Sequence, residues 1–217
     1  MKATSIILYG GKERRFGSRT SKALASVGGR PVIERIMSVL EPISSQIVIV
    51  TSPEKMDIPL AGRAAVVIDA YPGKGPLGGI YSGLLRAECH LSIVVACDMP
   101  FLNATLLTRM VQMAAGMDVV VPRLAGGMVE PLHAIYDRTC LAKMKDRLEA
   151  GHLPITPLFQ QLRVRYVERA EYLVIDPRML SFFNLNSVED LARANRIAHQ
   201  LDSGENIRIS GVGSARL

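Results

Sequence analysis

The sequence predicts a three-layer, doubly wound α/β fold around a mostly parallel sheet. Short apolar runs alternate along the chain with segments whose apolar residues recur at helical spacing, as in folds built from repeated strand–helix units. The length of 217 residues, with 48% hydrophobic and 21% charged residues, suits one sizeable globular domain. We therefore expect residues 1–199 to form a single domain, followed by a polar, loosely ordered tail at residues 200–217.

The first half of the chain predicts a regular alternation of strands and helices. Strands are expected at residues 4–8, 46–51, 64–68 and 91–97, and helices at residues 31–40 and 77–87. Pro31 suits the first turn of its helix, because the ring fixes a helical φ and the missing N–H is not needed there. The run "LSIVVAC" at residues 91–97 is the most apolar strand, so we place it at the centre of the sheet.

The second half continues the alternation up to a final helix. Strands are expected at residues 117–122, 131–137 and 163–167, and helices at residues 104–115, 138–150 and 188–199. Asn103 and Ser187 stand in the N-cap positions of two of these helices. Glu189 lies only two residues past Ser187, so we expect no capping box at the last helix.

Composition excludes several classes of protein. No apolar run approaches the ~20 residues that span a bilayer, and the N-terminus does not read as a signal peptide, so we expect a cytoplasmic protein without a membrane partner. Three scattered cysteines and four histidines show no metal-ligand spacing. The net charge of +6 suits an anionic ligand; with no tryptophan and few aromatic residues, we do not expect nucleic acid to be that ligand.

A glycine pair followed by basic residues opens the chain, in "LYGGKERRFGSRTSK". Gly10 and Gly11 end the first strand, at the sheet edge where open α/β folds bind ligands. Five basic residues and one acid give residues 12–22 a net charge of +4. The spacing matches neither a P-loop nor a dinucleotide fingerprint, so charged side chains would hold the phosphates. A solvated, charged turn is equally consistent with the spacing alone.

Two further segments place carboxylates at strand ends. In "ACDMPFL", Asp98 follows the central strand, where a carboxylate suits Mg²⁺ bound together with phosphates and water. In "IDAYPGKGPLGGI", Asp69 ends a strand and a glycine-rich turn leads into a helix, whose N-terminal amides could meet a ligand. A capping carboxylate and a flexible surface loop are the alternative interpretations.

Two late segments, "EPLHAIY" (130–136) and "FFNLNSVEDL" (182–191), carry polar residues within apolar surroundings. Asn184 and Asn186 share a face of an extended segment, because alternate residues of a strand point the same way. Two amides on one face could coordinate a metal or donate to a phosphate. Closure of a turn before the last helix is equally consistent with them.

In this order, the segments resemble the molybdenum cofactor guanylyltransferases, the MobA family of the nucleotidyltransferases. The resemblance covers about residues 4–195; its widely shared parts are the glycine-rich opening and "CDMPFL", and its narrower parts are "EPLHAIY" and "FFNLNSVEDL". It implies a Rossmann-like nucleotidyltransferase fold. Tyr9, Phe16 and Ser21 differ from the residues usual in this family, and "IVIVTS" lacks the asparagine usual at the end of its strand.

The resemblance also implies roles for individual residues along one sheet edge. These are Leu8, Tyr9 and Gly10 at the guanine, Gly11, Arg15 and Lys22 at the phosphates, Asp69 at the nucleoside, Asp98 on Mg²⁺, and Asn184 and Asn186 at the phosphate of the pterin. Arg15, Lys22 and Asp98 would be the catalytic residues, and Lys22 and Asp98 would also bind the nucleotide.

The activity that the resemblance implies is transfer of GMP from GTP to the terminal phosphate of molybdopterin or its metal-loaded form, with release of pyrophosphate. Mg²⁺ would be the cofactor, and proteins that deliver the cofactor or accept it, such as molybdoenzymes, would be partners. One alternative is a sister nucleotidyltransferase that uses CTP or a sugar phosphate. Another is a non-catalytic module that binds nucleotides or nucleic acid.

Overall fold

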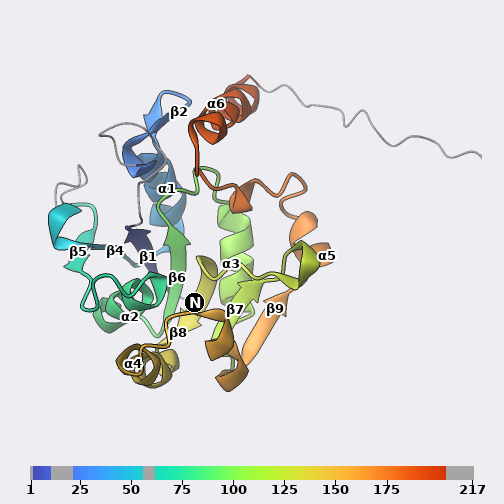
Figure 1. The fold of residues 1–217 in the computed structure, drawn as a ribbon. Coiled ribbons are helices and arrows are strands. Elements are labelled where there is room, and N and C mark those ends of the chain that lie inside the picture. The colour runs from blue at the N-terminus through green and yellow to red at the C-terminus, as the bar shows by residue number, and fades with distance from the viewer. Residues whose placement is uncertain (1, 11–21, 56–61, 204–217) are drawn as a thin grey trace, which may run out of the picture.

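The computed structural model describes residues 2–10, 22–55 and 62–203, which form a seven-stranded sheet with helices on both faces (Figure 1). The strands lie in the order β5-β4-β1-β6-β8-β7-β9. Their bounds are β1 (Thr4–Tyr9), β4 (Gln46–Thr51), β5 (Ala65–Ile68), β6 (Leu91–Ala96), β7 (Val119–Pro122), β8 (His133–Asp137) and β9 (Val164–Val167). Only β8 runs antiparallel to its neighbours β6 and β7 within this sheet, so the predicted mostly parallel sheet is confirmed.

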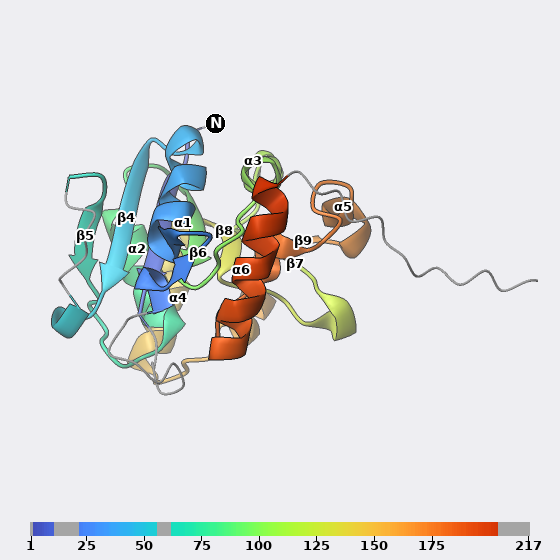
Figure 2. The ribbon, with the colours of Figure 1, turned by 90° about the horizontal axis from the view of Figure 1, so that it is seen from above.

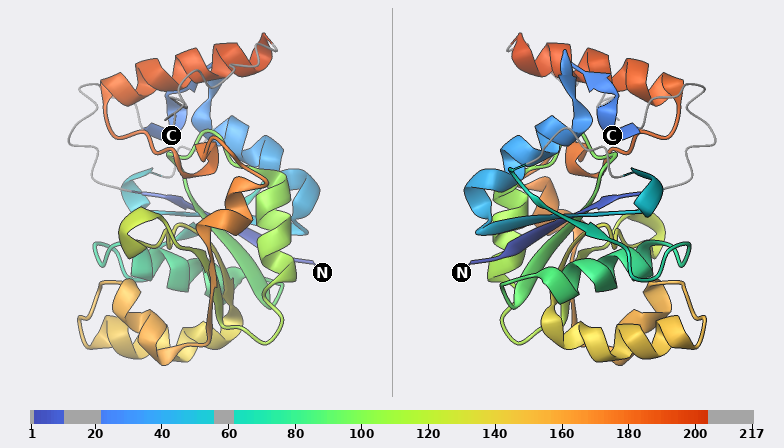
Figure 3. Two further views of the ribbon diagram at one scale, coloured as in Figure 1. Left: turned by 90° about the vertical axis from the view of Figure 1, so that its right-hand side faces the viewer. Right: turned by 90° about the vertical axis from the view of Figure 1, so that its left-hand side faces the viewer.

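The helices form the two outer layers. Their bounds are α1 (Val32–Leu40), α2 (Pro76–Arg86), α3 (Ala104–Gln112), α4 (Leu141–Glu149), α5 (Arg169–Leu173) and α6 (Val188–Asp202). One buried cluster joins the sheet to α1, α3 and α6, and a second joins it to α2 and α4, as the two side views show (Figure 3). This arrangement is the predicted three-layer fold.

The hairpin of β2 (Ser26–Val27) and β3 (Arg30–Pro31) supports α6, which lies across the upper side of the molecule (Figure 2). The Gly28 N–H donates to Asn195 Oδ1 at 2.9 Å, and a Cβ on Gly28 would lie 2.9 Å from Cβ of Ala198. Glycine therefore permits the close approach of the hairpin to the helix. The sequence patterns did not predict this hairpin or α5, because both are short.

Several predicted boundaries shift by a few residues. The helix expected at residues 104–115 ends at Gln112, and the one expected at residues 138–150 splits into a short 3-10 turn followed by α4. The last helix continues to Asp202, so residues 200–202 are helical and not part of a tail; residues 204–217 lie outside the described part. The prediction that the last helix has no capping box is wrong, because Asp190, not Glu189, occupies the required position and pairs with Ser187.

Glycines of helix α2 pack directly on side chains of β1. A Cβ on Gly83 would lie 2.5 Å from Cγ2 of Ile6, and one on Gly79 would lie 3.2 Å from Cδ2 of Leu8. The glycines thus bring the N-terminal end of α2 close to the carboxyl end of β1. Among the helices of the described residues, none is both long and apolar enough to cross a membrane.

Candidate active site

A cavity of about 580 Å³ lies at the carboxyl ends of β1, β4, β5 and β6. Its walls are Leu8, Tyr9, Gly10, Val50, Thr51, Ser52, Asp69, Pro72, Gly73, Gly75, Pro76, Gly79, Ala96, Cys97, Asp98 and Leu132. Five of the predicted site residues are among them, brought together from three separate parts of the sequence. The edge of the sheet therefore forms a hollow where parallel folds bind their ligands.

Asp69 is held by hydrogen bonds within its own turn. Its Oδ1 accepts from the Tyr71 N–H at 2.9 Å and from the Ser82 hydroxyl at 2.8 Å. The backbone N–H of Asp69 itself donates to Thr51 O at 2.8 Å, which ties this turn to the end of β4. A Cβ on Gly78 would lie 2.9 Å from the Tyr71 carbonyl oxygen, so the turn depends on a glycine there. The carboxylate is thus fixed in the cavity wall.

Lys22 links the segment that carries Asp98 to the segment that carries Asn186. Its ammonium lies 3.3 Å from Asp98 Oδ2 and 3.1 Å from Asn186 Oδ1. It starts the 3-10 helix η1 (Lys22–Leu24), and its side chain and that of Asp98 are 20% and 22% exposed. Asp98 and Asn186 lie 76 and 164 positions after Lys22 in the sequence, yet the fold joins all three at one edge of the sheet.

Backbone and capping contacts hold Asn186 in this place. The Leu185 N–H donates to the Asp98 carbonyl oxygen at 2.9 Å, so this segment lies directly against the loop after β6. Asp190 Oδ2 accepts from the N–H groups of Asn186 and Ser187 at 2.9 and 3.0 Å, which completes the capping box of α6. Asp190 therefore supports the site through the helix terminus, a role that the sequence patterns did not predict.

Glu130 is a further acidic residue at the site, and the motifs gave it no role. It is half-buried, and its side chain accepts from the Leu132 N–H at 3.3 Å. Burial is the main cause that raises its pKa, and the charge of Asp98 adds to this effect. The sequence signal that could have pointed to Glu130 is an acid directly before a proline and an apolar run.

The described residues show how a cation could be held. No group of three or more His, Cys, Asp or Glu side chains in the described ranges is close enough together to hold a metal ion. Asp98 Oδ2 and Asn186 Oδ1 nevertheless point at one position, which the ammonium of Lys22 occupies. Mg²⁺ typically takes one or two carboxylates and completes its shell with phosphate oxygens and water, so this donor set fits it.

His133 in "EPLHAIY" is no candidate for a general base. It is fully buried at the start of β8, and burial lowers the pKa of its imidazole to about 4, although Asp176 acts in the opposite direction. Its ring packs edge-on against Phe182, with centroids 5.1 Å apart. Its place in the core makes it a support for the segment that leads to Asn184.

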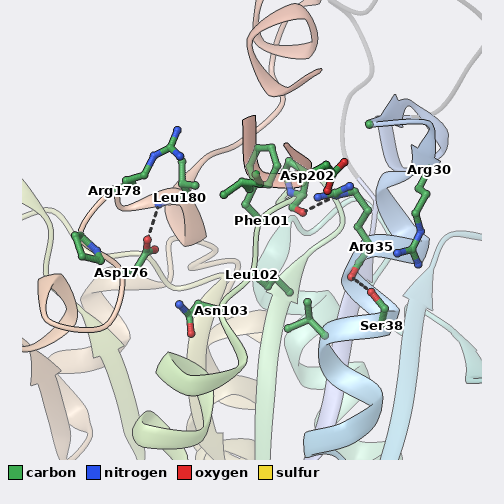
Figure 4. A pocket seen from close by; sticks show the side chains of 15 residues that line it. Arg30, Arg35, Ser38, Phe101, Leu102, Asn103, Asp176, Arg178, Leu180 and Asp202 are labelled. Atoms are coloured by element: carbon green, nitrogen blue, oxygen red, sulfur yellow. Dashed lines mark hydrogen bonds between the residues drawn. The ribbon is translucent and has the colours of Figure 1, made fainter. Parts of the chain in front are cut away.

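A second cavity, of about 470 Å³, lies between α1, the β2–β3 turn and the start of η7 (Leu180–Phe182) (Figure 4). It contains none of the predicted site residues and shares no wall with the first cavity. Its walls carry charges of both signs, from Arg30, Arg35, Arg178, Asp176 and Asp202. Arg35 donates to the carbonyl oxygens of Val27 and Pro100, so it serves the packing of the hairpin. We do not place the reaction here.

Gly11 and Arg15 lie outside the described residues, so their roles stay predictions; Phe16 and Ser21, which differ from the family pattern, lie outside them too.

Comparison with known proteins identifies the family. The model of the MobA-like NTP transferase domain matches residues 5–165, which is most of the chain. The chain belongs to this family. It is 34% identical over 204 residues to a probable molybdenum cofactor guanylyltransferase of Pelotomaculum thermopropionicum, covering 94% of this chain and 97% of the relative. It is 35% identical to the molybdenum cofactor guanylyltransferase of Desulfosudis oleivorans, covering 88% and 93% of the two chains.

Solved structures support the same assignment. The molybdopterin-guanine dinucleotide biosynthesis protein A of Archaeoglobus fulgidus has a TM-score of 0.78 and 28% identity, with 91% of this chain and 99% of that chain covered. The 2-C-methyl-D-erythritol 4-phosphate cytidylyltransferase of Thermus thermophilus has a TM-score of 0.66 at 18% identity, over 92% and 100% of the two chains. The second likeness concerns the fold alone. The predicted nucleotidyltransferase fold and the resemblance to the MobA family are therefore confirmed.

Proposed function

We propose that this protein transfers GMP from GTP to the terminal phosphate of molybdopterin, with release of pyrophosphate. The observation that carries the proposal is the meeting of Lys22, Asp98 and Asn186 beside a nucleotide-sized cavity at the sheet edge. The relatives named as molybdenum cofactor guanylyltransferases support the choice of substrates. Proteins that deliver the pterin or receive the product are part of the same proposal.

The nucleotide would lie in the cavity, with its base against Leu8, Tyr9 and Gly10. Tyr9 is 3% exposed and its side chain belongs to the core, so its backbone is the part that can face a base. Asp69 would contact the nucleoside from the opposite wall, since its carboxylate is already fixed there. The triphosphate would then extend toward Asp98 and Lys22.

Transfer would be an in-line displacement at the α-phosphorus of GTP. An oxygen of the terminal phosphate of molybdopterin forms a bond to this phosphorus, and the bond to the oxygen that bridges the α- and β-phosphates breaks. The electron pair leaves with pyrophosphate. A phosphate monoester already carries between one and two negative charges near neutral pH, so no strong general base is required. Alignment and neutralisation of charge are then the main tasks of the protein.

Lys22 supplies positive charge between the two anionic substrates. Before substrate arrives its ammonium lies at Asp98 and Asn186, and it would move to the phosphates when these two residues hold a cation. Asp98, with Asn186, would hold Mg²⁺. When bound, this ion would withdraw charge from the phosphate oxygens.

Two assays test the proposal. Thermal unfolding is measured with GTP, CTP, ATP or UTP, each with and without Mg²⁺, because a ligand that binds only the folded state raises Tm. We expect a Mg²⁺-dependent increase with GTP, and release of pyrophosphate that requires molybdopterin. Selectivity for CTP would assign the chain to a sister activity. Binding of random DNA without any effect of nucleotides would instead favour a nucleic-acid-binding module.

A further inference from the structure

Lys22, Asp98 and Asn186 stand on three separate segments, and contacts behind them determine how these segments meet. Lys22 belongs to η1, which leads through the β2–β3 hairpin into α1. The Ala25 N–H donates to Lys22 O at 3.2 Å, and the Val32 N–H donates to Ala25 O at 3.0 Å. The backbone of Lys22 is therefore placed by the start of α1.

Arg35 joins this part of the chain to the loop after β6. It lies in the first turn of α1, and its guanidinium extends toward the hairpin and the loop (Figure 4). Its Nη1 donates to Val27 O and its Nε donates to Pro100 O, both at 3.3 Å. Its guanidinium carbon also lies 5.4 Å from the centroid of the Phe101 ring, within the range of a cation–π contact. Pro100 stands two residues after Asp98, so a single side chain ties the hairpin to the loop that carries this carboxylate.

The segment that carries Asn186 is held on the same loop. The ring of Phe183 packs edge-on against that of Phe101, with centroids 5.9 Å apart. The Leu185 N–H donates to Asp98 O at 2.9 Å, so the backbones of the two segments are also joined. The loop after β6 therefore fixes this segment by two contacts, and the guanidinium in turn fixes the loop.

The chemistry of arginine suits this task. Its planar guanidinium presents several N–H donors in fixed directions, so it can hold two carbonyl oxygens from different segments at once. A lysine ammonium is a point charge on a flexible stem and fixes such a pair less well. Arg35 is half-buried in the wall of the second cavity, which shares no residue with the cavity at the sheet edge. Its removal should therefore spare the binding of the nucleotide.

We infer that Arg35 is a positioning residue for the transfer reaction: by bridging Val27 O and Pro100 O, it sets the place of Lys22 relative to Asp98. The inference rests on the proposed function. Arg35 acts through the backbone of the hairpin and of the loop, so it is distinct from the groups that meet the substrates. A misplacement of about 1 Å can cost about 10²-fold in rate, so loss of the bridge should lower kcat.

Two substitutions of Arg35 test the bridge, with pyrophosphate release in the presence of molybdopterin as the assay. Arg35→Met keeps an apolar stem but loses every donor, so we expect kcat to fall about tenfold while the KM for GTP stays within about twofold. Arg35→Lys keeps the charge and part of the bonding, and kcat should fall about threefold. Arg138→Met is the matched control: Arg138 also donates to a backbone carbonyl, that of Ala87, but at the opposite end of β6, so kcat should stay within about twofold.

A cycle with Lys22 separates positioning from a general loss of stability. In Lys22→Ala no ammonium remains to be placed, so adding Arg35→Met should lower kcat by less than about a further twofold. If Arg35→Met does not fold, the same cycle is run with Arg35→Lys. A kcat near that of wild type in the folded Arg35 variants, an equal loss in Arg138→Met, or an undiminished loss in the Lys22→Ala background would overturn the inference. Failure of the proposed function is a separate result, because wild type itself would then form no product.

Discussion

Two walls of the site are built in different ways. The wall that we assign to the nucleotide, formed by residues 8–10, 50–52 and 69–79, consists mainly of backbone, glycines and hydrogen bonds between near neighbours. The wall that we assign to transfer, formed by Lys22, Asp98, Glu130 and residues 184–186, consists of charged and amide side chains from distant parts of the chain. We call them the nucleotide wall and the transfer wall.

The difference concerns what each wall tolerates. In the nucleotide wall, shape depends on the absence of side chains, so added atoms are the main danger. In the transfer wall, Lys22 has its partners Asp98 and Asn186 on other segments, so loss of one group leaves a second one misplaced. Substitutions should therefore harm the two walls through different observables, and five predictions test this.

The largest effect is expected for Asp98→Asn in the transfer wall. The substitution keeps the shape but removes the negative charge that faces Lys22 and would hold Mg²⁺. We expect kcat to fall by about 10²–10³-fold, as for loss of a preorganised electrostatic contact. Tm should stay within about 2 °C of wild type, as expected when stability changes by well under 1 kcal/mol. Asp146→Asn, at an exposed position of α4, is the control; a kcat near that of wild type in Asp98→Asn would contradict the account.

Lys22→Ala should have the next largest effect. It removes the ammonium between Asp98 and Asn186, so two groups that approach the same cation lose their common partner. We expect kcat to fall by about 10²-fold, measured as pyrophosphate release at saturating substrates. Lys145→Ala, whose ammonium pairs weakly with Glu149 at 3.8 Å, should be neutral. Equal activities of the two variants would remove Lys22 from the mechanism.

The pH dependence of stability tests the support beneath the transfer wall. The pKa of His133 is lowered to about 4 in the folded protein, so the unfolded chain binds the proton more tightly. Its contribution is complete above pH 6.5 and is lost as pH falls toward 4, by about 2 kcal/mol at pH 5. Denaturant titrations at several pH values measure it. His133→Leu should flatten this slope, whereas the exposed His152→Leu should not; identical slopes in both would contradict the prediction.

Gly83→Ala tests the packing beneath the nucleotide wall. The new Cβ would lie 2.5 Å from Ile6 Cγ2, so α2 has to move away from β1. Overpacking costs about 1–3 kcal/mol, and the better helix propensity of alanine returns about 1, so we expect a net loss of about 1 kcal/mol. Gly10→Ala meets no described atom within 4 Å and should leave the free energy of unfolding unchanged. A higher free energy of unfolding for Gly83→Ala would contradict the close packing of α2 on Ile6.

The smallest effect is expected for Asp69→Asn in the nucleotide wall. An amide oxygen can still accept from Tyr71 and Ser82, so the turn keeps its form. We expect the KM for GTP to change by less than about threefold, whereas Asp69→Ala, which loses both contacts, should raise it about tenfold. If Asn and Ala were equally impaired, the charge of Asp69 and not its hydrogen bonding would be the important property.

The same contrast explains which features the sequence could predict. The nucleotide wall follows from local signals: apolar runs that end in glycine or aspartate place Gly10 and Asp69 at the ends of parallel strands, and the same signal places Asp98 of the transfer wall. Short elements such as the β2–β3 hairpin give too few residues for a periodic pattern.

The transfer wall depends on contacts that no local pattern encodes. Lys22, Asp98 and Asn186 lie far apart in the sequence, with 164 positions between the first and the last, and only the fold brings them together. The role of Asp190 was not predicted, because the cap was judged from Glu189, the acid at the preceding position. Only the fold therefore shows which of the predicted residues from distant segments lie together.

The most direct test of the central claim is a competition in one reaction. Wild-type protein, molybdopterin and Mg²⁺ are incubated with GTP and CTP at equal concentration, and the dinucleotide products are separated and identified by mass. We predict the guanine dinucleotide as the main product, formed together with an equal amount of pyrophosphate. A predominant cytosine product, or consumption of GTP that does not depend on molybdopterin, would contradict the account.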